Sequence, residues 1–398
     1  MTKLFDITGK AISGEWGSDD ENNTGIPVIR TTNFTNEGNI DYSNVVTRNI
    51  KKKNIGKKFL KQGDIVIEKS GGSDDQPVGR VVYFNGPNDR YLFNNFTGLL
   101  RIKDTTKWYP RYVFWVLYAS YKQGKTKLYQ NRTTGLHNLR TDAYVKDLDI
   151  NFIPLEEQKH ISEVLDKVRL QIELKEKELS KLDTLIKARF VEMYGDPIIN
   201  NKHLTEVSMT QICQIIDGDR GKNYPHAKDF ESEGYCLFLN AKNVTKNGFN
   251  FENCSYISKE RDELLRKGRV ERGDIVLTTR GTIGNLALYT NDIPYERLRI
   301  NSGMVILRMD HTKVLDRFFI EQFKMQLEKI KLKVASGSAQ PQLPVSTMNK
   351  IKIVLPSTKA QNEFASFVQQ VDKSKVVIQK SLDETQTLFD SLMQKYFS

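Results

Sequence analysis

The sequence predicts an α+β protein in which two similar domains are joined by two long α-helices that form an antiparallel coiled coil. Three observations predict this class: the chain repeats itself, each repeat mixes short β-rich runs with one amphipathic helix, and each repeat ends in a heptad pattern. A chain of 398 residues is long enough for two or more domains. We expect a first α+β domain over residues 1–154, a central helix region over 155–196, a second α+β domain over 197–355 and a C-terminal helix region over 356–398.

The internal repeat begins without gaps at a spacing of 210 residues. The segment 29–35 (Ile-Arg-Thr-Thr-Asn-Phe-Thr) aligns with 239–245 (Leu-Asn-Ala-Lys-Asn-Val-Thr), and Gly-Asp-Ile-Val occurs at both 63–66 and 273–276. Further on, the spacing falls to 205 residues because the first copy has an insertion at 72–77. Matches in the same order over this distance indicate that one ancestral unit was duplicated.

Within each copy, the composition predicts both strands and a helix. Short runs of β-branched and aromatic residues are bounded by Gly, Asn and Asp, which is typical of strands between turns. Each copy also has one stretch in which apolar residues recur at helical spacing. The predicted strands include 65–67, 81–84, 275–277 and 304–307, and the predicted helices include 111–121 and 315–330. Each copy is therefore expected to be a compact α+β domain.

Each domain is followed by a heptad pattern. Pro154 and Pro356 lie just ahead of the two patterns, where a proline favours the start of a helix, and each is followed by a Gln within five residues. The narrow apolar seam favours a coiled-coil pair, while two unrelated helices that each pack on their own domain remain the alternative. The seam residues are Ile161, Leu165, Val168, Ile172, Leu179, Leu182, Ile186 and Met193, and then Phe364, Val368, Val371, Ile378, Leu382, Phe389 and Leu392.

Composition narrows the class of protein. The net charge is +11, and the surplus lies in the two domains: residues 1–150 carry 23 Lys and Arg against 16 Asp and Glu, and residues 203–353 carry 23 against 18. This distribution suggests a polyanionic partner. No apolar run is long enough to span a bilayer and no apolar leader begins the chain, so we expect a soluble cytoplasmic protein without a membrane partner. Three cysteines and five scattered histidines form no ligand cluster, and no metal site is expected.

A search for catalytic motifs gives no catalytic residue. The segment 218–223 lacks the spacing and the Ser or Thr of a phosphate-binding loop, and the Asn/Asp-Pro-Pro-Tyr/Phe segment of amine-methylating enzymes is missing. Asp64, Glu68 and Lys69 could mimic a nuclease metal site. However, the second copy keeps the Gly-Asp-Ile turn and has Thr278 and Thr279 in place of the other two. A surface turn is therefore the better interpretation of Asp64.

Taken together, these motifs resemble the specificity (S) subunit of type I restriction–modification systems. Two basic α+β domains, each followed by Pro-x-x-x-Gln and a heptad helix, are typical of that family, and the resemblance covers nearly the whole chain. The first copy departs from the pattern, with Ser-Gly-Gly-Ser at 70–73 and a different segment at 133–139. In the second copy the resemblance rests on the segments 218–222, 240–244, 273–277, 280–285, 299–304 and 337–343.

The resemblance implies a non-catalytic subunit. Its two target-recognition domains would bind a bipartite site in double-stranded DNA, and the subunit would hold two methyltransferase subunits and, in the nuclease form, two restriction subunits. The methyltransferases would use S-adenosylmethionine on adenine, and the restriction subunits would use ATP and Mg²⁺. This chain itself is expected to bind none of these cofactors.

Candidate DNA-binding residues are polar side chains in glycine-flanked segments between the predicted strands. Such side chains can pair with base edges, Arg with guanine and Asn or Gln with adenine, while Lys and Ser contact phosphates. For each of them, a solvated loop or a turn-capping role is the alternative. Asn33 and Asn243 occupy matching positions in the two copies, which favours a role in holding the fold. The candidates are Arg30, Asn33, Lys69, Ser70, Gln76, Thr133, His137 and Asn138 in the first domain, and Arg220, Lys222, Asn223, Asn243, Arg280, Asn301 and Gln340 in the second.

Two other functions compete with this hypothesis. The first is a DNA methyltransferase or nuclease that acts in its own right, which binding of S-adenosylmethionine by the isolated chain would reveal. The second is a structural tether whose coiled coil is the working part, and a steep salt dependence of DNA binding would count against it.

Overall fold

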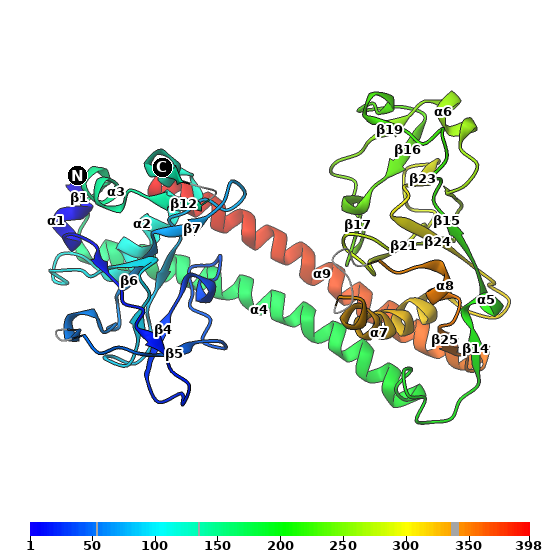
Figure 1. Ribbon diagram of the computed structural model, residues 1–398, viewed down its shortest axis with the longest axis horizontal. Helices are drawn as coiled ribbons and strands as arrows, with labels where there is room; N and C mark the ends of the chain where they lie inside the picture. The colour runs from blue at the N-terminus through cyan, green and yellow to red at the C-terminus, as the bar shows by residue number, and fades with distance from the viewer. Residues whose placement is uncertain (53–54, 134–135, 336–341) are drawn as a thin grey trace. The chain divides into compact units, whose positions relative to one another are not determined.

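The computed structural model describes residues 1–52, 55–133, 136–335 and 342–398, apart from the side chains of residues 132, 133, 136 and 333–335. The chain divides into two compact units. Unit 1 consists of Met1–Leu174 with Ser381–Ser398, and unit 2 consists of Lys175–Lys380. The long helices α4 (Leu155–Tyr194) and α9 (Thr358–Phe397) each contribute to both units (Figure 1). Each unit therefore combines one α+β domain with a part of each long helix.

Unit 1 contains short strands, three short helices and several 3-10 turns (η). The elements before the insertion are β1 (Thr2–Lys3), α1 (Leu4–Thr8), β2 (Ile12–Ser13), β3 (Ser18–Asp19), β4 (Ile26–Ile29), η1 (Thr31–Asn33), β5 (Val46–Asn49), η2 (Gly56–Lys58) and β6 (Ile65–Glu68). After β6 come β7 (Ser70–Gly72), β8 (Val81–Tyr83), β9 (Leu92–Phe93), β10 (Thr97–Leu100), α2 (Pro110–Lys122), η3 (Lys125–Tyr129), β11 (Gln130–Thr133), β12 (Leu136–Leu139), α3 (Thr141–Asp147) and β13 (Asp149–Ile150).

Unit 2 repeats the main sheet, the parallel strand pair and the domain helix of unit 1, with differences in the shorter elements. Its first half comprises β14 (Glu206–Ser208), α5 (Met209–Ile212), β15 (Cys213–Asp217), η4 (Ala227–Asp229), β16 (Cys236–Leu239), η5 (Ala241–Asn243), β17 (Val244–Thr245), β18 (Gly248–Phe249), β19 (Tyr256–Ile257) and α6 (Lys259–Leu264). Its second half comprises β20 (Arg269–Val270), β21 (Ile275–Thr278), β22 (Leu286–Leu288), β23 (Leu298–Ile300), β24 (Met304–Met309), α7 (Asp316–Ala335), α8 (Val345–Met348) and β25 (Lys352–Val354).

The strand pairing confirms the duplication. The main sheet has the order β2-β10-β6-β8 in unit 1 and β15-β24-β21-β22 in unit 2. A second sheet in each unit contains one parallel pair, β4 with β9 and β16 with β23, and both pairs begin from the repeated segments near residues 29 and 239. The four residues of β6 and of β21 are buried because each strand lies between two neighbours and below a helix. The predicted strands and helices therefore occur at the expected places.

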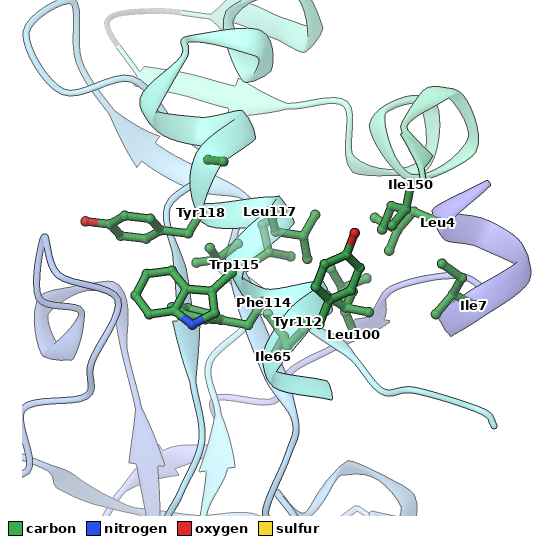
Figure 2. Packing of buried hydrophobic residues seen from close by; sticks show 14 of the residues in the cluster. Leu4, Ile7, Ile65, Leu100, Tyr112, Phe114, Trp115, Leu117, Tyr118 and Ile150 are labelled. Atoms are coloured by element: carbon green, nitrogen blue, oxygen red, sulfur yellow. The ribbon is translucent and has the colours of Figure 1, made fainter. Parts of the chain in front are cut away.

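The core of unit 1 forms where α2 packs on the main sheet. Figure 2 shows Phe114, Trp115 and Leu117 of α2 beside Ile65 and Leu100 of the sheet. All five of these side chains are fully buried. Burial of these large aromatic groups removes a large apolar area from water and stabilises the contact between helix and sheet.

The two long helices pair in antiparallel fashion within unit 2. The rings of Phe190 in α4 and Phe364 in α9 are 5.3 Å apart, and the Tyr194 hydroxyl donates to the Ala360 carbonyl at 2.6 Å. Phe190 also lies 5.6 Å from Phe318 of α7. The helices therefore pack on each other, as a coiled-coil pair would, and also on the domain. The heptad pattern had left these two kinds of packing as alternatives, and the structure combines them.

Unit 1 shows the same combination at the other ends of the helices. Leu165 and Ile172 of α4 share one buried cluster with Phe389 and Met393 of α9. The Phe389 ring is 5.7 Å from the ring of Trp115 in α2. At this end of the helices most predicted seam residues therefore pack together, with Met393 buried beside the predicted Leu392, and Phe389 also contacts the domain core.

The glutamine that follows each proline fixes the start of the long helix. Gln158 is fully buried; its side-chain oxygen accepts from the Tyr109 amide at 2.8 Å, and its nitrogen donates to the carbonyls of Lys107 and Ile153. In unit 2, Gln361 makes the same three kinds of bond around the start of α7. The glutamine four or five residues after the proline therefore ties the first turn of the long helix to the start of the preceding domain helix.

Candidate nucleic-acid interface

The glycine-rich segment after β15 is held against the turn that follows β23. A Cβ on Gly218 would lie 2.2 Å from the Asn301 carbonyl oxygen, so only glycine permits this approach. Asp219 is buried and accepts from the amides of Gly221 at 2.8 Å and Arg266 at 2.7 Å. Burial alone would raise the pKa of Asp219, but these backbone hydrogen bonds outweigh it and hold the pKa below its usual value. The segment is therefore a fixed loop.

Exposed cations project from this fixed loop. Arg220 is exposed and contacts the Asp217 carboxylate at 3.0 Å and the Ser302 carbonyl at 3.4 Å. Lys222 is also exposed, and Asn223 is partly exposed with its side chain donating to the Leu264 carbonyl at 3.2 Å. An exposed arginine bound to a neighbouring surface carboxylate can exchange that partner at little cost.

Arg280 lies next to this loop, at the end of β21. Its backbone amide donates to the Gly303 carbonyl at 3.2 Å, as does the amide of Thr279 at 2.8 Å. The Arg280 side chain is exposed. Asn301, in the same turn, accepts from the Gly303 amide at 2.9 Å and so caps the turn. We call the loops 217–223, 279–285 and 301–303 the unit 2 turn cluster.

One further cation, Arg266, lies against the unit 2 turn cluster and was not among the residues predicted from the sequence. Arg266 is exposed, and a Cβ on Gly221 would lie 3.0 Å from its guanidinium nitrogen. The backbone amide of Arg266 donates a hydrogen bond to the Asp219 carboxylate, and this bond brings Arg266 to the loop from a segment that is distant in sequence. A signal was present in the Arg-Lys-Gly-Arg run at 266–269, but only the fold places that run beside Arg220.

Unit 1 builds an equivalent cluster on the same backbone frame. A Cβ on Gly14 would lie 2.2 Å from the carbonyl oxygens of both Phe93 and Asn94, as for Gly218 in unit 2. The amides of Lys69 and Ser70 donate to the Phe96 carbonyl at 2.8 and 3.2 Å, which repeats the contacts of Thr279 and Arg280 with Gly303. We call the segments 13–15, 69–72 and 94–96 the unit 1 turn cluster.

An open pocket of about 700 Å³ lies at the unit 1 turn cluster. Three predicted residues, Lys69, Ser70 and Asn138, line it together. The Lys69 ammonium donates to the Ser13 hydroxyl at 2.9 Å, and burial lowers the pKa of Lys69 from its usual value. The fold thus brings together residues from β7 and β12, where Asn138 is the register partner of Ser70.

Two predicted DNA-binding residues are instead part of the scaffold. Asn33 and Asn243 are 2% and 1% exposed. The side-chain oxygen of each accepts the amide three residues earlier at 3.0 Å, and each amide nitrogen donates to two loop carbonyls. Because every polar atom of both side chains is occupied inside the domain, they hold the loops that follow η1 and η5. Neither side chain is therefore available to contact DNA.

The remaining first-domain candidates are dispersed. Arg30 is partly exposed and donates to the Asn44 carbonyl at 3.1 Å. Gln76 is exposed in the turn after β7, and its side chain donates to Asn36 at 3.4 Å. His137 is 7% exposed and its ring contacts Gln130 at 3.1 Å, so its burial argues against direct base contact. The side chain of Thr133 and the whole of Gln340 lie outside the described residues.

The turn expected at Gly-Asp-Ile is present in both copies, but its aspartate does not lie at the surface as the sequence suggested, because each carboxylate is buried against an arginine. Asp64 is 2% exposed and accepts two bonds from the Arg101 guanidinium, at 2.7 and 2.6 Å. Asp274 is 1% exposed and accepts the same pair from Arg308, at 2.9 Å each. Glu68 is likewise buried against Arg80. These carboxylates serve as partners of arginines in the fold and do not form a shared acidic site.

Among the residues that the structure describes, no group of three or more His, Cys, Asp or Glu side chains has a geometry that could hold a metal ion. Within the same ranges, none of the helices combines the length and the apolar character that a membrane span requires.

Comparison with known proteins places this architecture in a family. The family model described as "Type I restriction modification DNA specificity domain" matches the chain twice, at residues 2–184 and 201–385. A putative type I restriction enzyme MjaX specificity subunit from Methanocaldococcus jannaschii is 22% identical over 391 residues, covering 94% of this chain and 86% of the relative. The MjaVIII specificity subunit from the same organism is 23% identical over 263 residues, covering 61% of this chain and 59% of the relative.

Solved structures show the same fold. The S subunit of a type I restriction-modification system from M. genitalium matches with a TM-score of 0.53 at 15% identity, covering 100% of this chain and 95% of that chain. A chain from a structural study of complex assembly and conformational transition in the type I R-M system matches with a TM-score of 0.53 at 16% identity, covering 100% and 96%. With two family matches over most of its length, the chain belongs to the type I restriction–modification DNA specificity family.

Proposed function

We propose that this chain is the DNA sequence-specificity subunit of a type I restriction–modification complex and binds a bipartite site in double-stranded DNA through its two domains. The observation that carries the proposal is the pair of turn clusters. Both use the same backbone frame, yet they present different side chains, with Ser70 beside Phe96 in unit 1 and Arg280 beside Gly303 in unit 2. A shared frame with different polar groups is what two readers of different sequences require.

The chemistry of the unit 2 turn cluster favours DNA. Arg280 can donate two parallel hydrogen bonds to the O6 and N7 atoms of a guanine, a contact that distinguishes this base from the other three. Arg220, Lys222 and Arg266 are exposed around it and suit phosphate oxygens, which position a protein on the duplex without selecting sequence. The surplus of positive charge in the two domains also favours DNA as the partner.

The subunit is proposed to act without chemistry of its own. The carboxylates that could imitate a nuclease site are paired with Arg101 and Arg308 inside the domains. Adenine methylation would be performed by two methyltransferase subunits with S-adenosylmethionine, and cleavage by two restriction subunits with ATP and Mg²⁺. The cytoplasm, where such a complex meets DNA, is the proposed location.

The test is to co-express the chain with its partner methyltransferase and to map methylated adenines by sequencing. The expected result is one motif made of two short half-sites separated by an unread gap. The double variant Arg220→Glu with Arg280→Glu should abolish the methylation pattern, whereas the control Lys259→Glu, on α6 with a 59% exposed side chain, should preserve it. A contiguous motif, or a pattern that survives the double variant, would contradict the proposal.

A second measurement separates the competing functions. Binding of the isolated chain to duplex DNA should weaken with salt, with a slope of log K against log salt of about −0.9 for each phosphate contact. A structural tether would show no such slope. Calorimetric titration of the isolated chain with S-adenosylmethionine should give no heat of binding, and saturable binding would favour a methyltransferase in its own right.

A further inference from the structure

Phe96 is an exposed aromatic residue in the unit 1 turn cluster. Its side chain is 50% exposed, although the residue lies in the tight turn between β9 and β10. The turn is fixed, because the Phe96 carbonyl accepts the amides of Lys69 and Ser70, and the Thr97 hydroxyl donates to the Asn94 carbonyl at 2.8 Å. The backbone therefore holds an apolar ring at the surface in a defined place.

The duplication shows that the fold does not need this ring. The residue that accepts the equivalent pair of amides in unit 2 is Gly303, which has no side chain. In unit 2 the cation Arg280 stands where unit 1 has the small Ser70. The two clusters therefore carry different groups at the same two positions. Unit 2 has the guanidinium of Arg280 beside a glycine, and unit 1 has the hydroxyl of Ser70 beside an aromatic ring.

Several cationic side chains lie in the pocket beside Phe96. The pocket of about 700 Å³ beside it is lined by Lys10, Lys69 and Arg140, together with the exposed Asn95. Lys10 is paired with the exposed Asp142 at 2.8 Å, an interaction that phosphate can replace at little cost. An apolar group surrounded by cations fits a partner that offers both negative charge and an apolar spot. In the major groove of DNA, the only apolar group on a base edge is the C5-methyl group of thymine.

We propose that Phe96 is a specificity-determining residue that contacts the C5-methyl group of a thymine in the half-site bound by unit 1. This inference rests on the proposed function, because it names the base group recognised by one of the two clusters. The ring covers the methyl group, while the neighbouring lysines and arginine bind the flanking phosphates. Unit 2 has Gly303 in place of Phe96 and Arg280 in place of Ser70, and reads a guanine edge instead. The two half-sites therefore differ in chemical type as well as in sequence.

The test is a double-mutant cycle in which the Phe96 ring and the thymine methyl group are removed separately and together, and DNA binding is measured each time. The wild-type chain and its Phe96→Ala variant, each complexed with the partner methyltransferase, are titrated with the mapped bipartite DNA and with versions in which single thymines of the unit 1 half-site are replaced by uracil. Uracil removes only the methyl group. Loss of one buried methyl contact should weaken wild-type binding by about three- to tenfold at one position, and the same replacement should leave Phe96→Ala binding unchanged.

Matched controls keep the outcome clear. Phe152→Ala removes an equally exposed ring of the same unit, 56% exposed, and should retain the wild-type sensitivity to uracil. Phe96→Leu retains an apolar side chain and should retain part of that sensitivity, which protects the test if the alanine variant folds poorly. Uracil at every thymine of the unit 2 half-site should have no Phe96-dependent effect.

The possible failures are distinguishable. If the wild-type complex binds no bipartite site, the proposed function fails. If it binds a bipartite site but wild type and Phe96→Ala respond equally to uracil at every position, the inference about Phe96 fails and the function stands. A ring that wedges between bases would bend the DNA and tolerate uracil, and that result would also overturn the methyl contact.

Discussion

Replacing Asn243 by alanine tests whether this residue holds the fold or contacts DNA. Its side chain is 1% exposed; the oxygen accepts from the Asn240 amide at 3.0 Å, and the nitrogen donates to the carbonyls of Asn250 at 3.0 Å and Asn253 at 2.9 Å. These bonds close the loop between β16 and β19. Alanine would leave three backbone groups without this partner.

The magnitude follows from these three bonds. A buried polar group that loses its partner costs about 1–3 kcal/mol. The three groups lie in a loop where water can reach part of the backbone, so we expect the lower end for each and about 3 kcal/mol in total. For a domain of this size, each kcal/mol shifts the melting temperature by about 2–4 °C. The Asn243→Ala variant should therefore melt about 6–12 °C below the wild type.

Differential scanning calorimetry of the full chain measures this shift, and methylation mapping of the co-expressed complex measures recognition. The variant should lose stability in the unit 2 transition and keep the wild-type motif at permissive temperature. Asn247→Ala is the matched control, because Asn247 lies in the adjacent β17–β18 turn and is exposed. An unchanged melting temperature combined with an altered motif would refute the reasoning and return Asn243 to the base-contacting residues.

Three other predictions test the site, the helix anchor and the cysteines. Arg280→Ala should relax selection at one base pair of the unit 2 half-site by about 1–3 kcal/mol, measured by competition between site variants; uniform weakening at all sites would make it a phosphate contact. Gln361→Leu leaves three buried backbone groups unpaired and should lower the stability of unit 2 by about 2–3 kcal/mol, and a calorimetric trace equal to wild type would contradict this. Burial raises the pKa of Cys213 and Cys236 to about 12, so both thiols stay protonated at pH 8 and should resist iodoacetamide until the protein unfolds. The partly exposed Cys254 should be modified first. Mass spectrometry of the alkylated peptides measures this order, and early modification of Cys213 or Cys236 in the folded protein would contradict it.

The sequence alone was sufficient for the architecture. The repeat, the strand runs and the heptads are local patterns whose period is set by backbone geometry, so they can be recognised without the fold. The helices α4 and α9 occur where the heptads predict them, and β6 and β21 where Gly-Asp-Ile-Val predicts them. The presence of Asp64 and Asp274 in both copies correctly indicated a turn that holds the fold. The expected surface position was wrong, because both carboxylates are buried against arginines from distant segments.

The identity of the surface residues depended on contacts between distant segments. Both Ser70 and His137 were candidates from the sequence, yet Ser70 lines a pocket and His137 is buried. Sequence reasoning missed Phe96, because an aromatic residue after a strand is usually buried and nothing local shows that this ring points outward.

What the sequence by itself determined is the duplicated α+β plan, the paired helices and the excess of positive charge, because periodicity and composition are written residue by residue. What only the tertiary structure decided is which polar and aromatic groups meet at each turn cluster. Exposure and proximity arise from strand pairing between segments far apart in the chain, such as Ser70 with Phe96 and Arg280 with Gly303, and no local pattern encodes that pairing.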